Sequence, residues 1–431
     1  MTLAFASCLI ILFLLAAIGT PIALSMIVSA IFYLAMKGQD LGLAAEQIIQ
    51  GLYDSFLILA VPLFIIAANI MNAGTISERL LQFCVALVGR FRGGLGHVNV
   101  VANMIFAGMS GSAVADAVGL GKIIIGMMTK DGRYSPGYAA AITAAASTIG
   151  PIIPPSIPMV MYALVSDTSI GYLFLGGIVP GVMMGIVLMM MNARMARVHN
   201  VPVDVAVPMR ELPALTARAF PALLMPVILL FGIYGGATTP TEAAAVAALY
   251  SLLLATFFYR ALSFQALRGI LTESARATAS VGLIIGAALI FNYIVASENI
   301  PASVSSMMQG LNVSPLMFLI LVNILFLVLG CLLDATTIIL VIIPLFIPTC
   351  RALGIDLVHF GVVSVVNCMI GLITPPYGVL LFVINAITGI PLQTIIRSIW
   401  PFIGVLVAAL AIMIFVPDTV LFVPRMFGYG K

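Results

Sequence analysis

The chain has 431 residues, of which 63% are hydrophobic and only 8% are charged, and its formal net charge is +3. Soluble domains carry about 25% charged residues, and a soluble globule of this length needs a polar surface that this composition does not provide. The composition therefore excludes a soluble enzyme, a disordered chain and a nucleic-acid-binding protein. It predicts an all-α polytopic membrane protein, with room for about ten spans of roughly 20 residues each.

The N-terminal region carries no charge from Thr2 to Ala35. It predicts two consecutive hydrophobic helices joined at Gly19-Thr-Pro21, because a glycine ends a helix well and a proline favours the start of the next. Residues 37–54 are amphipathic, as are residues 259–276 in the second half of the chain. We expect both segments to be helices that lie in the membrane interface and brace a rigid scaffold.

A motif of glycines and prolines occurs twice in the chain. Gly150-Pro-Ile-Ile-Pro-Pro155 is matched by Gly371-Leu-Ile-Thr-Pro-Pro376. Upstream, and at nearly the same spacing, a polar Gly108–Ser112 segment is matched by Gly330–Asp334, and Asn69 is matched by Asn292. Several matches in one order indicate an internal repeat. The predicted division is a first repeat (1–195), a polar connector (196–217), a second repeat (218–416) and a C-terminal tail (417–431).

Each predicted repeat contains polar or helix-breaking residues in the middle of hydrophobic sequence. We expect a re-entrant helical hairpin at about 97–130 and 316–350, and a broken transmembrane helix at about 136–165 and 357–386. Non-helical backbone at this depth has no water to satisfy it, so it must line a cavity or bind a ligand. The four interruptions are therefore the first candidates for a functional site.

The distribution of basic residues predicts the orientation of the repeats. The connector is rich in arginine, including Arg194, Arg197 and Arg210, which places it in the cytoplasm by the positive-inside rule. Counting membrane crossings outward from the connector puts most other basic residues on the same side. The exceptions are Lys37, Arg351, Arg425 and Lys431. The two repeats then have opposite orientations, which is an inverted-topology repeat, and both chain termini are periplasmic.

Oxygen-bearing residues at the interruptions predict two cation sites. Hydroxyl, carbonyl and carboxylate oxygens suit alkali and alkaline-earth ions and not zinc or copper. The alternative for any single serine or threonine is a hydrogen bond to its own helix. The candidate ligands are Ser110, Ser112, Thr148 and Gly150 at the first site, and Asp334, Thr336, Thr337, Gly371 and Thr374 at the second.

Other polar residues near the interruptions have less certain roles. Asp334 lies at a hairpin tip and is favoured as a cation ligand, whereas Asp116 lies one turn past its tip and is favoured as a helix cap. Lys122 pairs with Asp116 or approaches an anionic substrate. Asn69 and Asn292 either join helices by hydrogen bonds or line the substrate path. Further candidates for lining this path are Pro155, Ser156 and Pro376.

Two features of the chain exclude other chemistry. Its five cysteines show no CxxC spacing and its three histidines lie far apart, so a transition-metal site is not predicted. No HExxH, GxSxG or adjacent intramembrane carboxylate pair occurs, so a membrane-embedded enzyme is not predicted. Thr239-Pro-Thr-Glu242 is interpreted as a helix capping box with proline at the first helical position.

Four of these segments resemble the large membrane subunit of TRAP (tripartite ATP-independent periplasmic) transporters, and the likeness covers essentially the whole chain. The matching segments are Phe106-Ala-Gly-Met-Ser-Gly-Ser-Ala-Val-Ala-Asp116, Ala144-Ala-Ala-Ser-Thr-Ile-Gly-Pro-Ile-Ile-Pro-Pro-Ser156, Thr239-Pro-Thr-Glu-Ala-Ala-Ala-Val246 and Thr374-Pro-Pro-Tyr-Gly378. Cys331-Leu-Leu333 in the second hairpin is more apolar than its counterpart in the first.

The resemblance implies an elevator-type fold with a scaffold and a transport domain in the bacterial inner membrane. It also implies sodium-coupled uptake of an organic anion, typically a carboxylate, with Na+ as the coupling ion and no other cofactor. The implied partners are a periplasmic substrate-binding protein and a small four-helix membrane subunit, which is expected on a separate chain. A self-sufficient sodium/carboxylate symporter without a soluble partner is the alternative.

Overall fold

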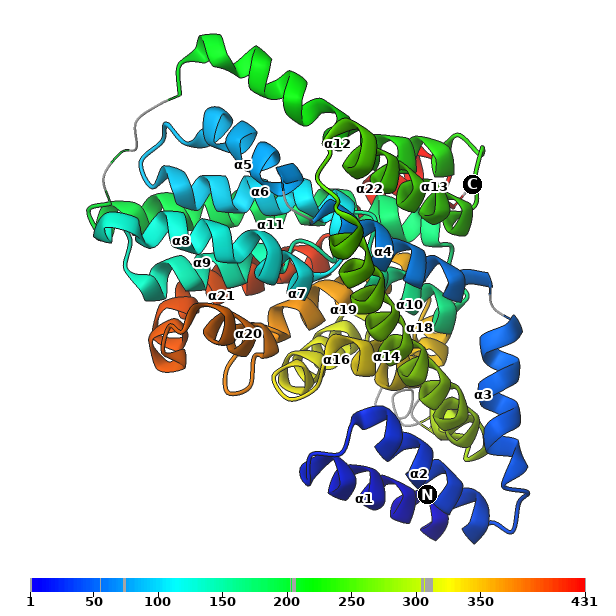
Figure 1. Cartoon of the computed structure of the whole chain (residues 1–431). Coiled ribbons are helices and arrows are strands. Elements are labelled where there is room, and N and C mark those ends of the chain that lie inside the picture. The colour runs from blue at the N-terminus through cyan, green and yellow to red at the C-terminus, as the bar shows by residue number, and fades with distance from the viewer. Residues whose placement is uncertain are drawn as a thin grey trace.

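The computed structural model describes residues 2–54, 56–72, 75–201, 203, 207–303, 306 and 313–430. Within these residues the chain is built of helices and their connections, and the predicted all-α fold is confirmed (Figure 1). Lys431 and residues 202 and 204–206 of the connector lie outside the described residues.

The first half of the chain contains eleven described α-helices, which follow one another in this order: α1 Leu3–Ala17, α2 Ile22–Met36, α3 Gly42–Asp54, α4 Ala60–Met71, α5 Thr75–Val88, α6 Gly94–Ser110, α7 Ala113–Asp116, α8 Lys122–Thr129, α9 Pro136–Ser147, α10 Ile157–Ser166 and α11 Ile170–Val198. Residues Ala117–Gly121, between α7 and α8, are π-helical. The break between α1 and α2 lies where Gly19 and Pro21 predicted it, with Gly19 at a positive φ of 88°.

The second half of the chain has a similar order of elements. Its described α-helices are α12 Leu212–Tyr234, α13 Pro240–Leu253, α14 Phe264–Ser297, α16 Pro315–Gly330, α17 Ala335–Thr337, α18 Ile347–Ala352, α19 Leu357–Gly371, α20 Val379–Thr388, α21 Leu392–Phe415 and α22 Asp418–Met426. Residues Ile338–Ile342, after α17, are π-helical, as are Ala117–Gly121 at the equivalent place.

The predicted interruptions are present in both halves. Hairpin tips separate α6 from α7 and α16 from α17, and helix breaks separate α9 from α10 and α19 from α20. The Pro154–Pro155 and Pro375–Pro376 peptide bonds in the two breaks are both cis. The predicted capping box at Thr239 is also present, with Glu242 bonding back to the Thr239 backbone. The opposite orientation of the two halves stays a prediction.

One expectation about the boundaries of elements is wrong. Residues 264–276 are not a separate interfacial helix, because they continue without a break into α14, which is 34 residues long. Around the predicted connector, α11 extends to Val198 and α12 begins at Leu212. The C-terminal residues contain α22, whose Val420 and Leu421 are buried, and α22 packs against α11.

The number of full spans is also smaller than the composition indicated. Among the described helices, five are long and apolar enough to cross a membrane: α11, α12, α13 with its π-helical extension to Phe258, α14 and α21. Shorter apolar helices supply part of the remaining hydrophobic sequence, including α1, α2, α10, the second hairpin and the second broken helix. A count based on length alone treats every hydrophobic run as a complete crossing, whereas several of these runs form helices too short to cross a membrane.

The helices pack in two groups. In the first group, α14 packs against α2, α3 and α4, while α13 packs against α4 and α12. The second group contains the hairpins and broken helices together with α11 and α21, which pack against each other and against α6, α9 and α19. The long α14 runs past both, and α1 and α2 lie at its C-terminal end (Figure 1).

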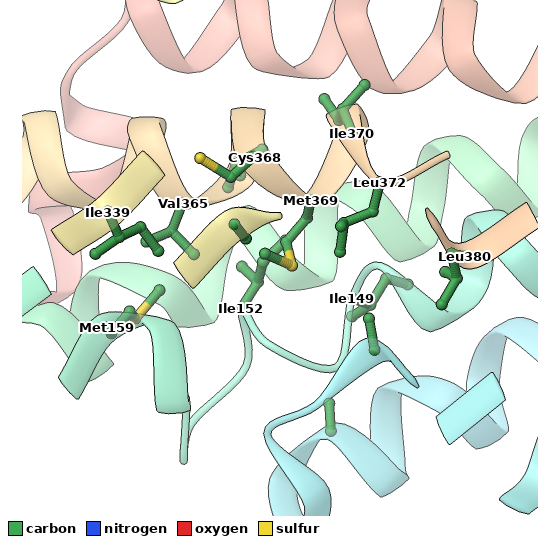
Figure 2. Close-up of a cluster of buried hydrophobic side chains, with 14 of the residues drawn as sticks. Ile149, Ile152, Met159, Ile339, Val365, Cys368, Met369, Ile370, Leu372 and Leu380 are labelled. Carbon is green, nitrogen blue, oxygen red and sulfur yellow. The ribbon is translucent and has the colours of Figure 1, made fainter. Parts of the chain in front are cut away.

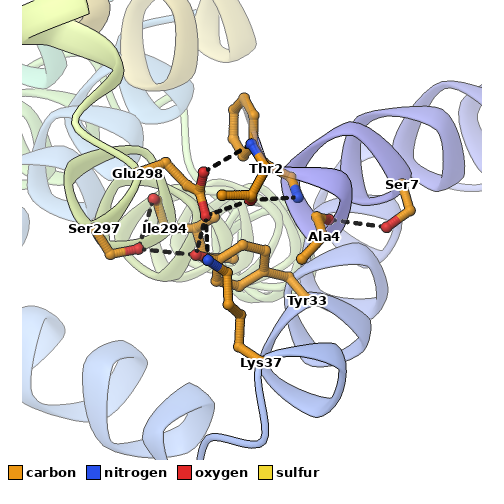
Figure 3. Close-up of polar contacts among 9 residues, drawn as sticks. Thr2, Ala4, Ser7, Tyr33, Lys37, Ile294, Ser297 and Glu298 are labelled. Atoms are coloured by element: carbon orange, nitrogen blue, oxygen red, sulfur yellow. Dashed lines mark hydrogen bonds and ion pairs between the residues drawn. The ribbon is translucent and has the colours of Figure 1, made fainter.

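A polar network joins the N-terminal helices to the end of α14 (Figure 3). The Glu298 carboxylate accepts hydrogen bonds from the Thr2 hydroxyl (2.6 Å) and the Tyr33 hydroxyl (2.8 Å). It also forms an ion pair with the Lys37 ammonium group at 2.9 Å, and its own side chain is only 3% exposed. Burial raises the pKa of this carboxyl, but the hydrogen bonds that it accepts have the larger combined effect and lower the pKa from 4.5 to about 2.

We expect Glu298→Gln to lower the free energy of unfolding at pH 7 by about 1–3 kcal/mol, because contacts to a charged group are lost. A lowered carboxyl pKa stabilises the fold above the ordinary pKa of 4.5, and this contribution is lost as the pH falls toward 2. The difference in free energy of unfolding between the wild type and Glu298→Gln should therefore persist between pH 7 and pH 5 and decrease below pH 5. Unfolding of the detergent-solubilised chain measures it.

Asp418→Asn is the matched control for this substitution. Asp418 also pairs with a basic side chain, Arg425, but it is 69% exposed, so its loss should cost less than about 1 kcal/mol. Equal destabilisation by the two substitutions contradicts a special role for the Glu298 network.

Candidate functional site

A cavity of about 600 Å³ lies between the two groups of helices. The first group contributes α4 and α14, and the second contributes both hairpin tips, the start of α10 and residues around the second break. Its polar lining residues are Asn69, Asn72, Ser110, Ser112, Glu273, Asp334 and Thr336. The structure thus brings candidate ligands of both predicted cation sites to the walls of one cavity.

The first hairpin tip is positioned by contact with the first helix break. Gly111 has a φ of 59°, and a Cβ added to it would lie 2.5 Å from the carbonyl oxygen of Pro155. A glycine is therefore required both by the left-handed backbone and by the close approach. Ser112 follows and caps α7, since its hydroxyl accepts a hydrogen bond from the Ala115 amide at 3.4 Å.

Asp116 occupies a different place from the one expected. It does not cap a helix, because Ser112 does so and Asp116 makes no capping hydrogen bond. Its side chain is fully buried next to Gly150. The Ser110 side chain lies close to its carboxyl group, yet neither carboxylate oxygen has a hydrogen-bond partner among the described residues.

Lys122 does not compensate the Asp116 carboxylate, because Lys122 is exposed on α8. A buried carboxylate without a partner is unfavourable by several kcal/mol. The arrangement around Ser110, Asp116 and Gly150 therefore favours an added positive charge, and Asp116 joins the candidate ligands of the first site.

The second hairpin tip has an aspartate in the capping position. The Asp334 carboxylate accepts hydrogen bonds from the Thr337 amide at 3.1 Å and from the Thr337 hydroxyl at 2.5 Å. It also lines the cavity, as does Thr336. Gly330 and Gly371 bring this hairpin against the second break, since a Cβ on Gly371 would lie 2.7 Å from the Gly330 Cα.

Several predicted site residues lie outside the cavity lining. The hydroxyls of Thr148 and Thr374 donate to carbonyls of their own helices, Ala145 at 2.6 Å and Ile370 at 2.8 Å. This is the alternative that the sequence left open for such residues. Ser156 is fully buried, donates to the Pro151 carbonyl and caps α10.

The remaining lining candidates differ in their surroundings. Pro155 is buried against the first hairpin tip, whereas Pro376 is exposed. The Asn292 amide donates to the Leu340 carbonyl at 3.3 Å. The Asn69 amide donates to the Ser274 hydroxyl at 2.9 Å and also lines the cavity. Asn69 therefore joins α4 to α14 and also lines the cavity, and its predicted place on a substrate path stays a prediction.

Sequence reasoning missed Asn72 and Glu273. Asn72 lies one turn beyond Asn69 at the C-terminal end of α4, so the spacing of three residues was a usable signal. Glu273 falls within residues 259–276, which the sequence predicts to be an interfacial helix with a bracing role only. Because α14 is continuous, this part of it reaches the cavity, and Glu273 is among the lining residues.

A cluster of buried apolar side chains packs against both helix breaks (Figure 2). Ile149 and Ile152 from the first break meet Met369 and Leu372 near the second, and all four are almost fully buried. Side chains from α10, α19 and α20 complete this cluster. The non-helical backbone of the breaks is thereby held in place by close packing.

The sequence matches known proteins along nearly its whole length. Residues 9–419 match the family described as "Tripartite ATP-independent periplasmic transporter, DctM component". The chain is 40% identical over 415 residues to the sialic acid TRAP transporter large permease protein SiaM of Vibrio cholerae, covering 96% of this chain and 97% of that protein.

Two further relatives have other substrates in their names. The C4-dicarboxylate TRAP transporter large permease protein DctM of Pseudomonas aeruginosa is 42% identical, with 87% of this chain and 88% of that protein covered. The 2,3-diketo-L-gulonate TRAP transporter large permease protein YiaN of Escherichia coli is 37% identical, with 94% and 95% covered.

The fold is also similar to that of a solved structure. The crystal structure of the Alcanivorax borkumensis YdaH transporter superposes with a TM-score of 0.61 at 15% sequence identity, covering 89% of this chain and 88% of that chain. At this identity the comparison shows a shared fold and nothing about substrate.

We expect Gly371→Ala to abolish transport activity and to lower the unfolding temperature, because the added methyl group meets the Gly330 backbone, which cannot move aside as a flexible side chain can. The cost should be about 1–3 kcal/mol. Gly404→Ala in α21 is the control, since its Cβ would meet nothing within 4 Å, and it should be neutral or slightly stabilising. Similar behaviour of the two variants contradicts the close contact.

Proposed function

The chain belongs to the DctM-component family of TRAP transporters and is a large permease of that family, and from this premise we propose that it carries out sodium-coupled uptake of an organic anion. The observation that carries the proposal is the cavity on whose walls both hairpin tips present oxygen ligands. The named substrates of the relatives, sialic acid, C4-dicarboxylates and 2,3-diketo-L-gulonate, support a carboxylate as the transported anion.

The first coupling-ion site in this proposal lies behind the first hairpin tip. Its ligands are the hydroxyls of Ser110 and Ser112, the backbone around Thr148 and Gly150, and the buried Asp116 carboxylate. An alkali ion held there supplies the positive charge that Asp116 lacks, and oxygen ligands of this kind suit such an ion.

The second coupling-ion site uses the other hairpin tip and break. Asp334, Thr336 and Thr337 come from the tip, and Gly371 and Thr374 from the break. The Asp334 carboxylate already accepts two hydrogen bonds from Thr337, which orients its oxygens and leaves lone pairs for a cation.

The substrate anion is proposed to bind in the cavity between these sites. Ile157 and Pro158, at the start of α10, and Val379, at the start of α20, line the cavity. The N-terminus of each half-helix carries partial positive charge, which favours an anionic group. Asn69 and Asn72 offer amide donors to the rest of the substrate, while Glu273 repels a second anion from that wall.

The proposed partners are a small membrane subunit on a separate chain and a periplasmic substrate-binding protein, with the complex in the bacterial inner membrane. The relatives' designation as large permeases supports a smaller companion. The competing proposal is a symporter that needs no soluble partner. Reconstitution with and without a binding protein distinguishes them, because only the symporter transports substrate alone.

We expect Ser112→Ala, Asp116→Asn and Asp334→Ala each to raise the sodium concentration needed for half-maximal uptake by roughly tenfold, since a contact to a charged group contributes about 1.5–3 kcal/mol. Ser398→Ala, a partly buried serine of α21 that bonds to its own helix and lies outside the cavity lining, should leave it unchanged. Uptake of labelled carboxylates into proteoliposomes under sodium gradients measures the effect. Equal uptake driven by a proton gradient without sodium contradicts the proposal.

The transport movement in this proposal is an elevator motion, in which the second group of helices moves against the first. A disulfide between the groups tests it. A Cβ on Gly119 would lie 3.7 Å from the Asn72 Cβ, which is within the range for a disulfide. We expect oxidation of an Asn72→Cys/Gly119→Cys variant to abolish uptake, with sodium binding retained and uptake restored by reduction to the level of the single Asn72→Cys variant.

The matched control for this cross-link lies inside the second group. A Cβ on Gly181 of α11 would lie 3.6 Å from the Ile153 Cβ in the first break. An Ile153→Cys/Gly181→Cys disulfide should therefore leave much of the uptake intact. Unchanged uptake after oxidation of the Asn72–Gly119 pair contradicts the elevator motion and favours local gating.

A further inference from the structure

A second hollow shares no lining residue with the central cavity. It is a groove of about 520 Å³ between the end of α5, the start of α6 and the C-terminal half of α11. The lining residues are Val88, Phe91, Arg92, His97, Ile186, Met189, Met190, Ala193 and Arg197. No acidic residue is among these described residues.

The two ends of the groove differ in chemistry. Ile186 and Met190 on α11 are 46% and 60% exposed, as expected for side chains that face lipid acyl chains. Arg197 lies in the last turn of the same helix and is also exposed. The groove therefore changes from apolar to cationic along α11.

The length of α11 relates this change to the depth of the membrane. Its 29 residues extend for about 43 Å, which is longer than the roughly 30 Å of hydrocarbon in a bilayer. Arg197, at the very end of α11, then lies at the level of the headgroups. Ile186 lies about 16 Å deeper, among the acyl chains.

Packing holds Arg92 beside the same end of α11. The turn that precedes α6 contacts α11 closely, because the Asn192 amide donates to the Gly93 carbonyl at 3.1 Å. A Cβ on Gly93 would lie 2.6 Å from the Cβ of Ala196. Asn192 is itself fixed by the Tyr138 hydroxyl at 2.6 Å. These contacts fix the position of Arg92, which precedes Gly93, and of the first turn of α6, which follows it.

The Arg92 side chain is oriented by a hydrogen bond, and no acidic residue in the described lining of the groove neutralises its charge. Its guanidinium donates to the Asn200 side-chain oxygen at 3.4 Å, just beyond the end of α11. His97 lies in the first turn of α6 with its ring edge against Phe91, at a centroid distance of 6.2 Å. The headgroup end thus offers two guanidinium groups and an imidazole.

We propose that this groove binds a phospholipid with an anionic headgroup, with its phosphate between Arg92 and Arg197 and its acyl chains along Ile186 and Met190. Basic pockets between transmembrane helices recognise anionic lipid headgroups in this way. The groove lies beside α5, which packs against both α12 and α6. A bound lipid therefore adds a contact to α6 and α11 at a place where α5 already joins them to α12.

Native mass spectrometry of the full-length chain tests this proposal. The purified chain is exposed to equal amounts of phosphatidylglycerol and phosphatidylethanolamine with identical acyl chains. We expect phosphatidylglycerol to be retained preferentially. Each arginine should contribute roughly a fivefold gain in affinity, so Arg92→Gln/Arg197→Gln should lose most of the preference. Arg194→Gln, on the same helix but outside the groove, should keep it.

Two further arms separate a lipid site from a site for phosphate. Met190→Trp fills the apolar part of the groove without removing charge and should also reduce retention of phosphatidylglycerol. Millimolar inorganic phosphate should not displace the lipid. If the double variant unfolds, the exposed Arg197→Gln alone serves, with about a fivefold loss expected. Equal retention of the two lipids, retention unaffected by these substitutions, or displacement by inorganic phosphate overturns the proposal.

Discussion

Backbone that leaves the helical conformation inside a membrane must have its polar groups satisfied by the protein itself. Both halves of this chain depend on that constraint, because two hairpin tips and two helix breaks place such backbone near the middle of hydrophobic sequence. Ser112, Ser156 and Asp334 cap the helices that restart after three of these interruptions, whereas Gly378 precedes α20 without a side-chain cap. Turn-like backbone hydrogen bonds also occur in both breaks.

Small residues make this arrangement compact enough to be stable. Gly111 lies against the Pro155 carbonyl, and Gly330 lies against Gly371, so each hairpin tip touches the break in its own half of the chain. The apolar cluster around Ile149, Ile152 and Met369 packs the two breaks together (Figure 2). Met369 and Leu372 of this cluster also line the cavity, whose walls therefore combine apolar side chains with the polar ones of the hairpin tips.

The first group of helices meets this assembly mainly through the cavity and a few bridging contacts. Asn69, Asn72 and Glu273 face the hairpin tips across the cavity, while the Glu298 network secures α1 and α2 at the far end of α14 (Figure 3). The groove near Arg92 and Arg197 lies between the end of α5, the start of α6 and the C-terminal half of α11, away from this cavity.

The sequence by itself determined the membrane class and the places where the helices are interrupted, and it supplied most of the candidate ligands as predictions. These features are local, because composition, Gly-Pro motifs and capping residues act over a few neighbouring positions. Tertiary structure alone decided that Asp116 is buried beside Gly150 with no hydrogen-bond partner among the described residues, and that Glu273 lines the cavity. The same holds for Thr148 and Thr374, whose hydroxyls bond to their own helices. A side chain's surroundings depend on which distant helices pack against it, and the helical period alone does not specify those neighbours.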